Sequence, residues 1–172
     1  VNLAYSLKPT VMLKAGYNLR IGRPDISYLS PYVSRPTAES QSYGNPNLDS
    51  EKAHNFELGF SAFGTKQNLS TTLGYSVRTN GLTAYTFLND NLTTTYGNML
   101  HQKSLTLNAF INWTVAKGTM FTFNCNCSYD DFKAYRYYNN ESATNNGFGG
   151  FFYGSLSQTL PGKFKLTLHG GG

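Results

Sequence analysis

Regular alternation of apolar and polar residues is the feature that most constrains the fold of this chain. Phe56, Leu58 and Phe60 alternate with polar or small residues, and no segment sustains the 3.6-residue apolar period of a helix. Successive side chains of a strand point to opposite faces of a sheet, so each alternating run predicts a strand with one apolar face. The predicted strands are 1–7, 11–21, 55–62, 68–78, 105–113, 121–130, 148–160 and 163–168.

Most of these runs have about 9–13 residues, which is long for a globular strand, where about 5–6 residues is usual. A tilted strand that crosses a bilayer needs roughly 9–11 residues. The run 148–160 has a less regular phase, because Phe151 and Phe152 are adjacent. Strand length therefore favours a membrane protein over a soluble sheet.

The connections between the runs alternate between short and long. The short connections are 8–10, 64–67, 116–118 and 161–162, and the long ones are 22–52, 79–100 and 131–147. Outer-membrane barrels have short turns on the periplasmic side and longer loops outside. Within 79–100, the turn-type residues Asn89–Asn91 lie between two apolar stretches, which predicts a hairpin.

Composition agrees with a sheet that has one face in lipid and one in water. Aromatic residues make up 15% of the chain and charged residues only 13%, against about a quarter charged in soluble domains. The charges within the runs fall on the polar phase: Lys14, Arg20, Glu57, Arg78 and Asp130. Aromatic residues expected at the membrane interfaces are Tyr5, Tyr17, Tyr75, Trp113 and Tyr129. The predicted fold class is all-β: an antiparallel up-and-down meander of about eight long strands, part of a transmembrane β-barrel.

Several function classes find no support in the sequence. The net charge is +5, but the basic residues are scattered, so no nucleic-acid-binding stripe is expected. Cys125 and Cys127 are interpreted as small apolar residues of one strand face, and the three histidines lie far apart. No set of candidate catalytic groups converges, so we expect no enzymatic activity, no cofactor and no metal.

Four segments carry a resemblance to a known family. In chain order they are Tyr17–Pro24, Leu29–Tyr32, Gly44–Glu51 and Asn55–Phe60, and together they resemble the barrel of a TonB-dependent outer-membrane receptor. The departures from the family pattern are Ser30 for Asn, Tyr32 for Phe, Ser50 for Pro and Phe60 for Tyr. The match spans about residues 17–60. Beyond residue 60 the likeness is limited to the general pattern of long alternating strands.

The residues of this motif are expected to serve barrel folding and packing rather than substrate binding. They are Arg20, Arg23, Pro24, Gly44, Asn45, Pro46, Leu48, Glu51 and Glu57. Pro24 and Pro46 fix φ and remove backbone donors where pairing should stop, and Gly44 permits a tight reversal. Glu51 and Glu57 are expected to pair with Arg20 or Arg23, because arginine binds carboxylates bidentately.

The resemblance implies a larger machine, in which a plug domain sits inside a 22-stranded barrel and scarce substrates are taken up. Residues 1–172 would form a single barrel segment without the plug, and both chain ends look cut. The implied partners are outer-membrane lipid, the plug, TonB and an iron chelate, cobalamin or glycan, with the Gram-negative outer membrane as the location. Alternatives are a stand-alone eight-stranded outer-membrane barrel acting as pore or anchor, and a secreted β-sandwich for binding or adhesion.

A candidate ligand-contact loop lies in the last long connection. Tyrosine rings can stack on sugar or chelate rings, and asparagine both donates and accepts hydrogen bonds. The residues are Tyr135, Tyr137, Tyr138 and Asn139. The competing interpretation of this segment is a solvated loop without a binding role.

Overall fold

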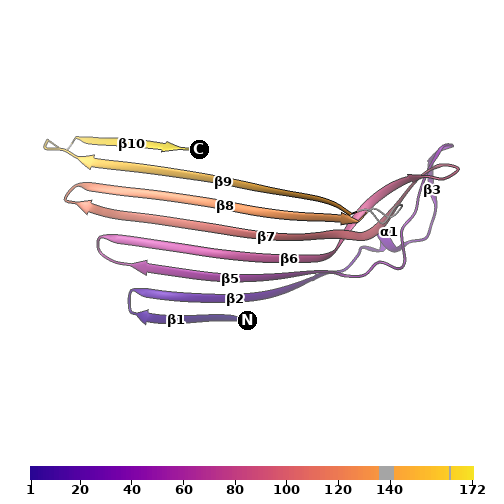
Figure 1. The fold of residues 1–172 in the computed structure, drawn as a ribbon, viewed down its shortest axis with the longest axis horizontal. Coiled ribbons are helices and arrows are strands. Elements are labelled where there is room, and N and C mark those ends of the chain that lie inside the picture. The colour runs from indigo at the N-terminus through magenta and orange to yellow at the C-terminus, as the bar shows by residue number, and fades with distance from the viewer. Residues whose placement is uncertain (136–141, 163) are drawn as a thin grey trace.

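The computed structural model describes residues 1–135, 142–162 and 164–172, which form one curved layer of β-sheet (Figure 1). The sheet has ten strands. Their bounds are β1 Asn2–Lys8, β2 Val11–Gly22, β3 Ser34–Thr37, β4 Ser40–Ser42, β5 Glu51–Phe63, β6 Gln67–Leu88, β7 Leu92–Ala116, β8 Thr119–Tyr135, β9 Ser142–Thr159 and β10 Lys165–Gly171. One short helix, α1, spans Ile26–Leu29.

The strands form the predicted meander. Their order in the sheet is β1-β2-β5-β6-β7-β8-β9-β10, and every neighbouring pair on this path is antiparallel. The two short strands lie off this path, where β3 pairs with β4 and β4 pairs in parallel with β7. The predicted all-β, up-and-down architecture is therefore confirmed.

The tight connections gather at one end of the sheet, as expected. They join β1 to β2, β5 to β6, β7 to β8 and β9 to β10 at the left of Figure 1. Gly118 takes φ +80° in the β7–β8 turn, a conformation that side chains other than glycine rarely adopt. The long connections lie at the opposite end, which we call the outer rim because outer-membrane barrels have their longer loops outside.

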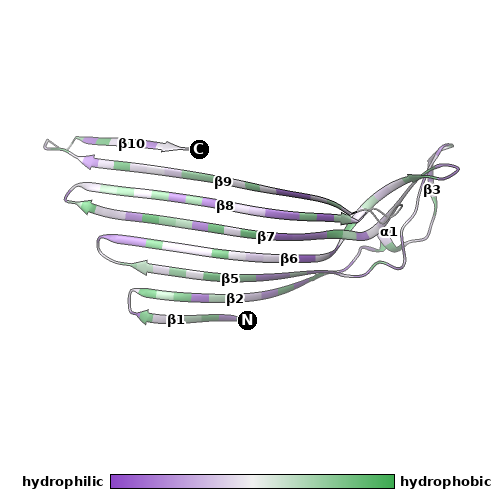
Figure 2. Ribbon diagram, in the orientation of Figure 1, coloured by the Kyte–Doolittle hydropathy of each residue, from purple (hydrophilic) through white to green (hydrophobic). Residues whose placement is uncertain are grey.

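Strand register keeps one mainly apolar and one mainly polar face across the sheet. On one face, Leu3, Ala15, Leu58, Leu73 and Leu107 are successive cross-strand partners. On the other face, a second row of successive partners runs through Lys14, Gly59, Thr72, Asn108 and Asn126. Figure 2 shows the resulting alternation of hydrophilic and hydrophobic residues along the strands.

The apolar face has no soluble core to join. Among the described residues no hydrophobic side chain is buried, and Leu58 is 59% exposed. Each such side chain left in water forgoes about 1.5–3 kcal/mol of burial free energy. The aromatic residues predicted for the membrane interfaces face the same way, with Tyr5, Tyr75, Trp113 and Tyr129 exposed. A single layer of this kind is suited to lipid on one side, and it does not fit the two packed sheets of a β-sandwich.

The long connections contain more regular structure than the sequence analysis predicted. We call the path of eight long strands from β1 to β10 the wall. Strands β6 and β7 have 22 and 25 residues, well above the expected 9–13, because they continue past the other wall strands as the predicted hairpin around Asn89–Asn91. A register shift lies between Arg78 and Leu82, where Asn80 takes φ +58°. The short elements α1, β3 and β4 occupy the connection 22–52, in which no element was predicted.

Helix α1 shows a local capping interaction that the sequence analysis did not use. The side chain of Asp25 accepts a hydrogen bond from the backbone N–H of Ser27 at 2.9 Å. This bond stabilises the ionised carboxylate and lowers the pKa of Asp25 below its ordinary value. No helix of the described residues is both long and apolar enough to cross a membrane.

Candidate functional site

The most elaborate side-chain structure lies at the outer rim, where the connection between β2 and β5 packs on the extended β6–β7 hairpin. We call residues 23–50 together with 79–100 the rim cap. Strand β4 pairs in parallel with β7, with Gln41 opposite Thr93. The Gln41 amide donates to Thr93 Oγ1 at 3.0 Å, and Thr93 is 1% exposed. The rim cap therefore contains buried polar side chains, whereas the apolar face of the wall is exposed.

Gly44 and Asn45 attach the connection to α1 through their backbones. The Gly44 N–H donates to Ser30 O at 2.8 Å, and the Asn45 N–H donates to Tyr28 O at 2.7 Å. A Cβ at Gly44 would lie 2.5 Å from Tyr28 O and 2.6 Å from Ser30 O. Only glycine permits so close an approach of two backbone segments.

The Asn45 side chain extends this attachment to the hairpin. Its Nδ2 donates to Tyr96 O at 3.0 Å, while its Oδ1 accepts from the Asn47 N–H at 3.0 Å in an Asx turn. The ring of Tyr96 contacts the ring of Tyr28, with centroids 4.7 Å apart. Asn45 thus joins three parts of the rim cap: its own turn, the α1 segment and β7.

Asn98 is a second clamp, and the sequence analysis did not identify it. Its Oδ1 accepts from the Asp49 N–H at 2.7 Å, and its Nδ2 donates to Asp49 O at 2.9 Å and to Asn80 O at 2.8 Å. One side chain therefore holds both the end of the β2–β5 connection and the left-handed residue of β6. The chain is rich in asparagine, so residue type alone gives no signal for this position.

Replacement of Asn98 by alanine is expected to loosen the rim cap. Three hydrogen bonds are lost, each with a net contribution of about 0.5–1.5 kcal/mol, so the cost is about 2 kcal/mol. Amide hydrogen exchange of residues 45–50 should accelerate while exchange in the wall strands stays unchanged. The matched control is Asn89→Ala in the hairpin turn, because only the backbone of Asn89 has a hydrogen bond among the described residues. Equal exchange in the two variants would contradict the clamp.

The ion pair of the motif differs from the prediction. Glu51 Oε2 lies 2.7 Å from Arg78 Nη2, and this is the one salt bridge within the described residues. The expected pairing of Glu51 with Arg20 or Arg23 is therefore wrong. The reason is register: Glu51 is opposite Gly22 on β2, whereas Arg78 lies on the neighbouring strand β6, opposite Ala53.

Glu57 and Arg20 face the same polar side without pairing. They line a hollow of about 360 Å³ with Asn2, Gly16, Tyr17, Asn18 and Asn55. Arg20 is opposite Ala53 and Glu57 is opposite Gly16, so the two charges lie four residues apart along the strands. The predicted Glu57–Arg20 or Glu57–Arg23 pair does not form in the part of the chain that the structure describes.

The remaining motif residues lie in or beside the rim cap. Arg23, Pro46 and Asp49 are exposed, while Pro24 and Leu48 are half-buried. Within residues 1–135, 142–162 and 164–172, no three His, Cys, Asp or Glu side chains are grouped for a metal. The arrangement suits packing of the outer rim, which remains a prediction for these residues.

The candidate ligand loop is described only at its first residue. Tyr137, Tyr138 and Asn139 lie outside the described residues. Tyr135 ends β8, is 49% exposed and contacts His101 edge to face, with ring centroids 5.4 Å apart. Its placement at the outer rim leaves the proposed ligand contact as a prediction.

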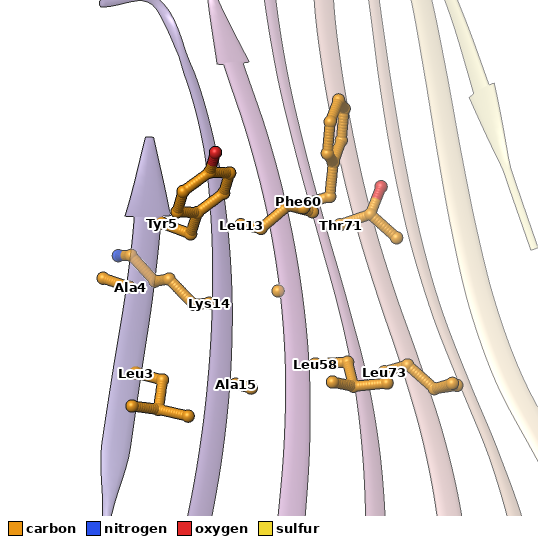
Figure 3. Close-up of a pocket in the computed structure, with 11 residues that line it drawn as sticks. Leu3, Ala4, Tyr5, Leu13, Lys14, Ala15, Leu58, Phe60, Thr71 and Leu73 are labelled. Atoms are coloured by element: carbon orange, nitrogen blue, oxygen red, sulfur yellow. The ribbon is translucent and has the colours of Figure 1, made fainter. Parts of the chain in front are cut away.

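A second hollow lies on the apolar face and is visible in Figure 3. Its volume is about 610 Å³, and its lining is almost entirely apolar, with Leu3 and Tyr5 from β1 and Leu58 and Phe60 from β5. The hollow forms because Ala15 on β2 is smaller than its cross-strand partners Leu3 and Leu58. Lipid acyl chains fill hollows of this kind on a lipid-facing surface. Farther along the same face, Cys125 and Cys127 are free thiols with sulfurs 3.4 Å apart.

Comparison with known proteins places the chain among outer-membrane barrels. A family model described as "Outer membrane protein beta-barrel family" matches residues 1–171. The fold is similar to the siderophore receptor PirA from Pseudomonas aeruginosa, with a TM-score of 0.58, 15% identity, and coverage of 99% of this chain and 41% of that one. A mutant of the ferric enterobactin receptor PfeA from the same organism gives a TM-score of 0.56 and 14% identity, with coverage of 96% and 33%. No curated protein matches the sequence.

Proposed function

The chain belongs to the outer membrane protein beta-barrel family, and from this we propose that it forms part of the barrel wall of a TonB-dependent receptor that takes up a scarce nutrient. The protein is located in the Gram-negative outer membrane. The chain spans about two fifths of the length of PirA and a third of PfeA. Residues 1–172 would thus be a single wall segment, with a plug and a TonB-contacting segment supplied elsewhere in such a receptor.

The observation that carries the proposal is the continuous polar face of the sheet. Polar or small residues occupy most of it from β1 to β10, and the charged pair Arg78–Glu51 lies on the same side. The large apolar residues on this face include Met12, Phe110, Met120 and Phe151. A face of this kind suits the interior of a wide barrel, which either holds water or surrounds a folded plug. The similar fold of two siderophore receptors favours an iron chelate among the proposed substrates, and cobalamin or a glycan rests on the family resemblance alone.

Substrate contact is proposed at the outer rim, because a nutrient arriving from outside meets this end first. The proposed contact residues are Tyr135 at the end of β8 and, next along the sequence, Tyr137, Tyr138 and Asn139. Rings that stack and amides that both donate and accept fit a planar chelate or a sugar. The proposed activity is binding and uptake rather than enzymatic catalysis.

A first experiment tests the membrane barrel. We expect the purified protein to need detergent for a β-type circular dichroism spectrum, and its band on a gel to shift after boiling. A stand-alone eight-stranded barrel would show the same shift without any plug in the parent gene. A monodisperse β protein in plain buffer would overturn the proposal.

A second experiment tests uptake in the native host. We expect deletion of the gene to abolish growth on one limiting nutrient among ferric chelates, cobalamin and glycans, and the intact gene to restore it. Replacing Tyr135 by alanine in the restoring copy should weaken growth on that nutrient alone. Normal growth of the deletion strain on every limiting nutrient would contradict a role in uptake.

A further inference from the structure

Three lysines break the apolar pattern of the lipid-facing side, and all three lie toward the outer rim. Lys52 has the same strand phase as Phe56, Lys103 the same as Leu105, and Lys133 the same as Tyr129. No other lysine or arginine of the described strands has this phase in β2 or in β5 to β10. The other strand charges of the wall, such as Lys14, Arg20 and Arg78, face the polar side.

These lysines lie just beyond a row of aromatic side chains. Successive cross-strand partners in this row are Tyr17, Phe56, Tyr75, Leu105, Tyr129 and Phe148. The rings of Tyr17 and Phe56 are 5.0 Å apart, and those of Phe56 and Tyr75 are 6.4 Å apart. Aromatic rings of this kind mark the boundary between hydrocarbon and headgroups.

The lysines lie in or just beyond the expected headgroup layer. Lys103 is two residues beyond Leu105, and Lys52 and Lys133 are each four residues beyond the aromatic row. At about 3.3 Å per residue, these steps correspond to about 7 and 13 Å along the strands. The headgroup layer extends about 5–8 Å beyond the hydrocarbon on each side, so Lys103 lies within it. Lys52 and Lys133 lie beyond it, and their long side chains can reach back toward the headgroups.

The three ammonium groups can converge on one ligand. Lys103 is the cross-strand partner of Asp131, so Lys133 is its diagonal neighbour, at about 7–8 Å between backbones. Lys52 lies on the other side of β6, opposite Thr79. None of the three pairs with a carboxylate within the described residues, where the salt bridge is Arg78–Glu51. Among the described residues of the wall strands, Asp131 is the only acidic side chain with the phase of these lysines, so three lysines face one carboxylate there.

The two histidines of the same region, His54 and His101, contact neighbouring tyrosine side chains. Tyr17 Oη lies 2.9 Å from His54 Nδ1, and His101 contacts Tyr135. The Tyr17–His54 contact adjoins the aromatic row, whereas the His101–Tyr135 contact lies beyond it at the rim, and the lysines are the exposed cations of this region. All three lysines are exposed.

We propose that Lys52, Lys103 and Lys133 form a binding site on the outer surface of the barrel wall for the phosphorylated sugar headgroup of an outer-leaflet glycolipid. Phosphate groups complement the unpaired ammonium groups, and the nearby polar side chains Thr79, Thr144 and Asn146 can bind sugar hydroxyls. The acyl chains of the same lipid lie along the apolar face below. The inference depends on the outer-membrane location and on the outward direction of the long connections, and not on the nutrient taken up.

Binding of purified lipid A to the protein in detergent, followed by native mass spectrometry, tests the site. The test variant combines Lys52→Gln, Lys103→Gln and Lys133→Gln. At about a fivefold loss for each lysine near a charged surface, the triple variant should bind lipid A roughly 100-fold more weakly. The corresponding Lys→Arg triple keeps the charges and should bind within about threefold of the unmodified protein. Lys133→Gln alone should lose about fivefold, which preserves the test if the triple variant folds poorly.

A charge-matched control replaces Lys8, Lys66 and Lys117, which lie at the short-turn end, by glutamine. It should retain lipid A binding, and dephosphorylated lipid A should bind poorly to every form. Full binding by the outer triple variant, or equal loss in the control, would overturn the site. Competition by inorganic phosphate at the concentration of lipid A would also overturn it, in favour of a free anion. The heat-shifted gel band reports barrel folding separately, so failure of this site is distinguishable from failure of the barrel.

Discussion

Leu107→Arg is expected to prevent most of the protein from folding in lipid. Leu107 lies in the central strand β7, within the row of apolar partners that includes Leu58 and Leu73. An arginine facing lipid near the bilayer centre costs about 2–4 kcal/mol, which is a large part of a typical folding free energy of about 5–15 kcal/mol. The measurement is the fraction of heat-shifted protein after refolding into liposomes, together with the urea concentration at mid-unfolding.

The matched control is the next residue of the same strand. Asn108 is exposed on the polar face, with Thr72 and Asn126 as its cross-strand partners. Asn108→Arg adds the same charge and the same bulk on the water side, so refolding should change little. If Asn108→Arg impaired refolding as much as Leu107→Arg, the assignment of lipid and water to the two faces would be wrong.

Gly44→Ala is expected to detach the β2–β5 connection from the rim while the barrel wall stays intact. The added Cβ would lie 2.5 and 2.6 Å from two backbone carbonyl oxygens, which cannot swing away as a flexible side chain could. Forced separation of these segments loses the Gly44 and Asn45 backbone hydrogen bonds as well. Overpacking and the two lost bonds together cost about 3 kcal/mol. Limited proteolysis should then cut residues 23–50 in the variant far faster than in the unmodified protein.

Gly154→Ala serves as the control for backbone and composition effects. Gly154 lies in β9, and a Cβ there would meet nothing within 4 Å. Its protease pattern and heat-shifted band should match those of the unmodified protein. Continued protection of residues 23–50 in Gly44→Ala would show that the close approach at Gly44 does not hold the rim cap together.

The wall of the sheet could be predicted from sequence because its physics is local. Alternation along one strand decides which face each side chain takes, and tight turns such as Ala116–Lys117–Gly118 join neighbouring strands without ambiguity. The hairpin around Asn89–Asn91 was also predicted, for the same reason. Alternation does not show where a strand ends once it has left the membrane, because both of its faces are then in water. The lengths of β6 and β7 were therefore underestimated.

The outer rim was less predictable because its contacts are long-range. The partner of Glu51 depends on the register of three strands, and Arg78 is 27 residues away in the chain. Asn98 reaches Asp49 across 49 residues, and it resembles every other asparagine in the sequence. Helix α1 has 4 residues, too few to show a helical period, although Asp25 before Ile26 and Ser27 was a usable capping signal.

The buried polar side chains of the rim cap have a consequence for how the protein unfolds. The wall takes its stability from lipid, because its apolar face has no protein neighbour. The rim cap takes its stability from protein hydrogen bonds such as the one from Gln41 to the buried side chain of Thr93. We therefore expect the wall, which faces lipid, and the rim cap, which faces water, to unfold as separate cooperative units. The rim can open and close on its own, at a free-energy cost set by a few hydrogen bonds, while the wall below it remains folded in the membrane.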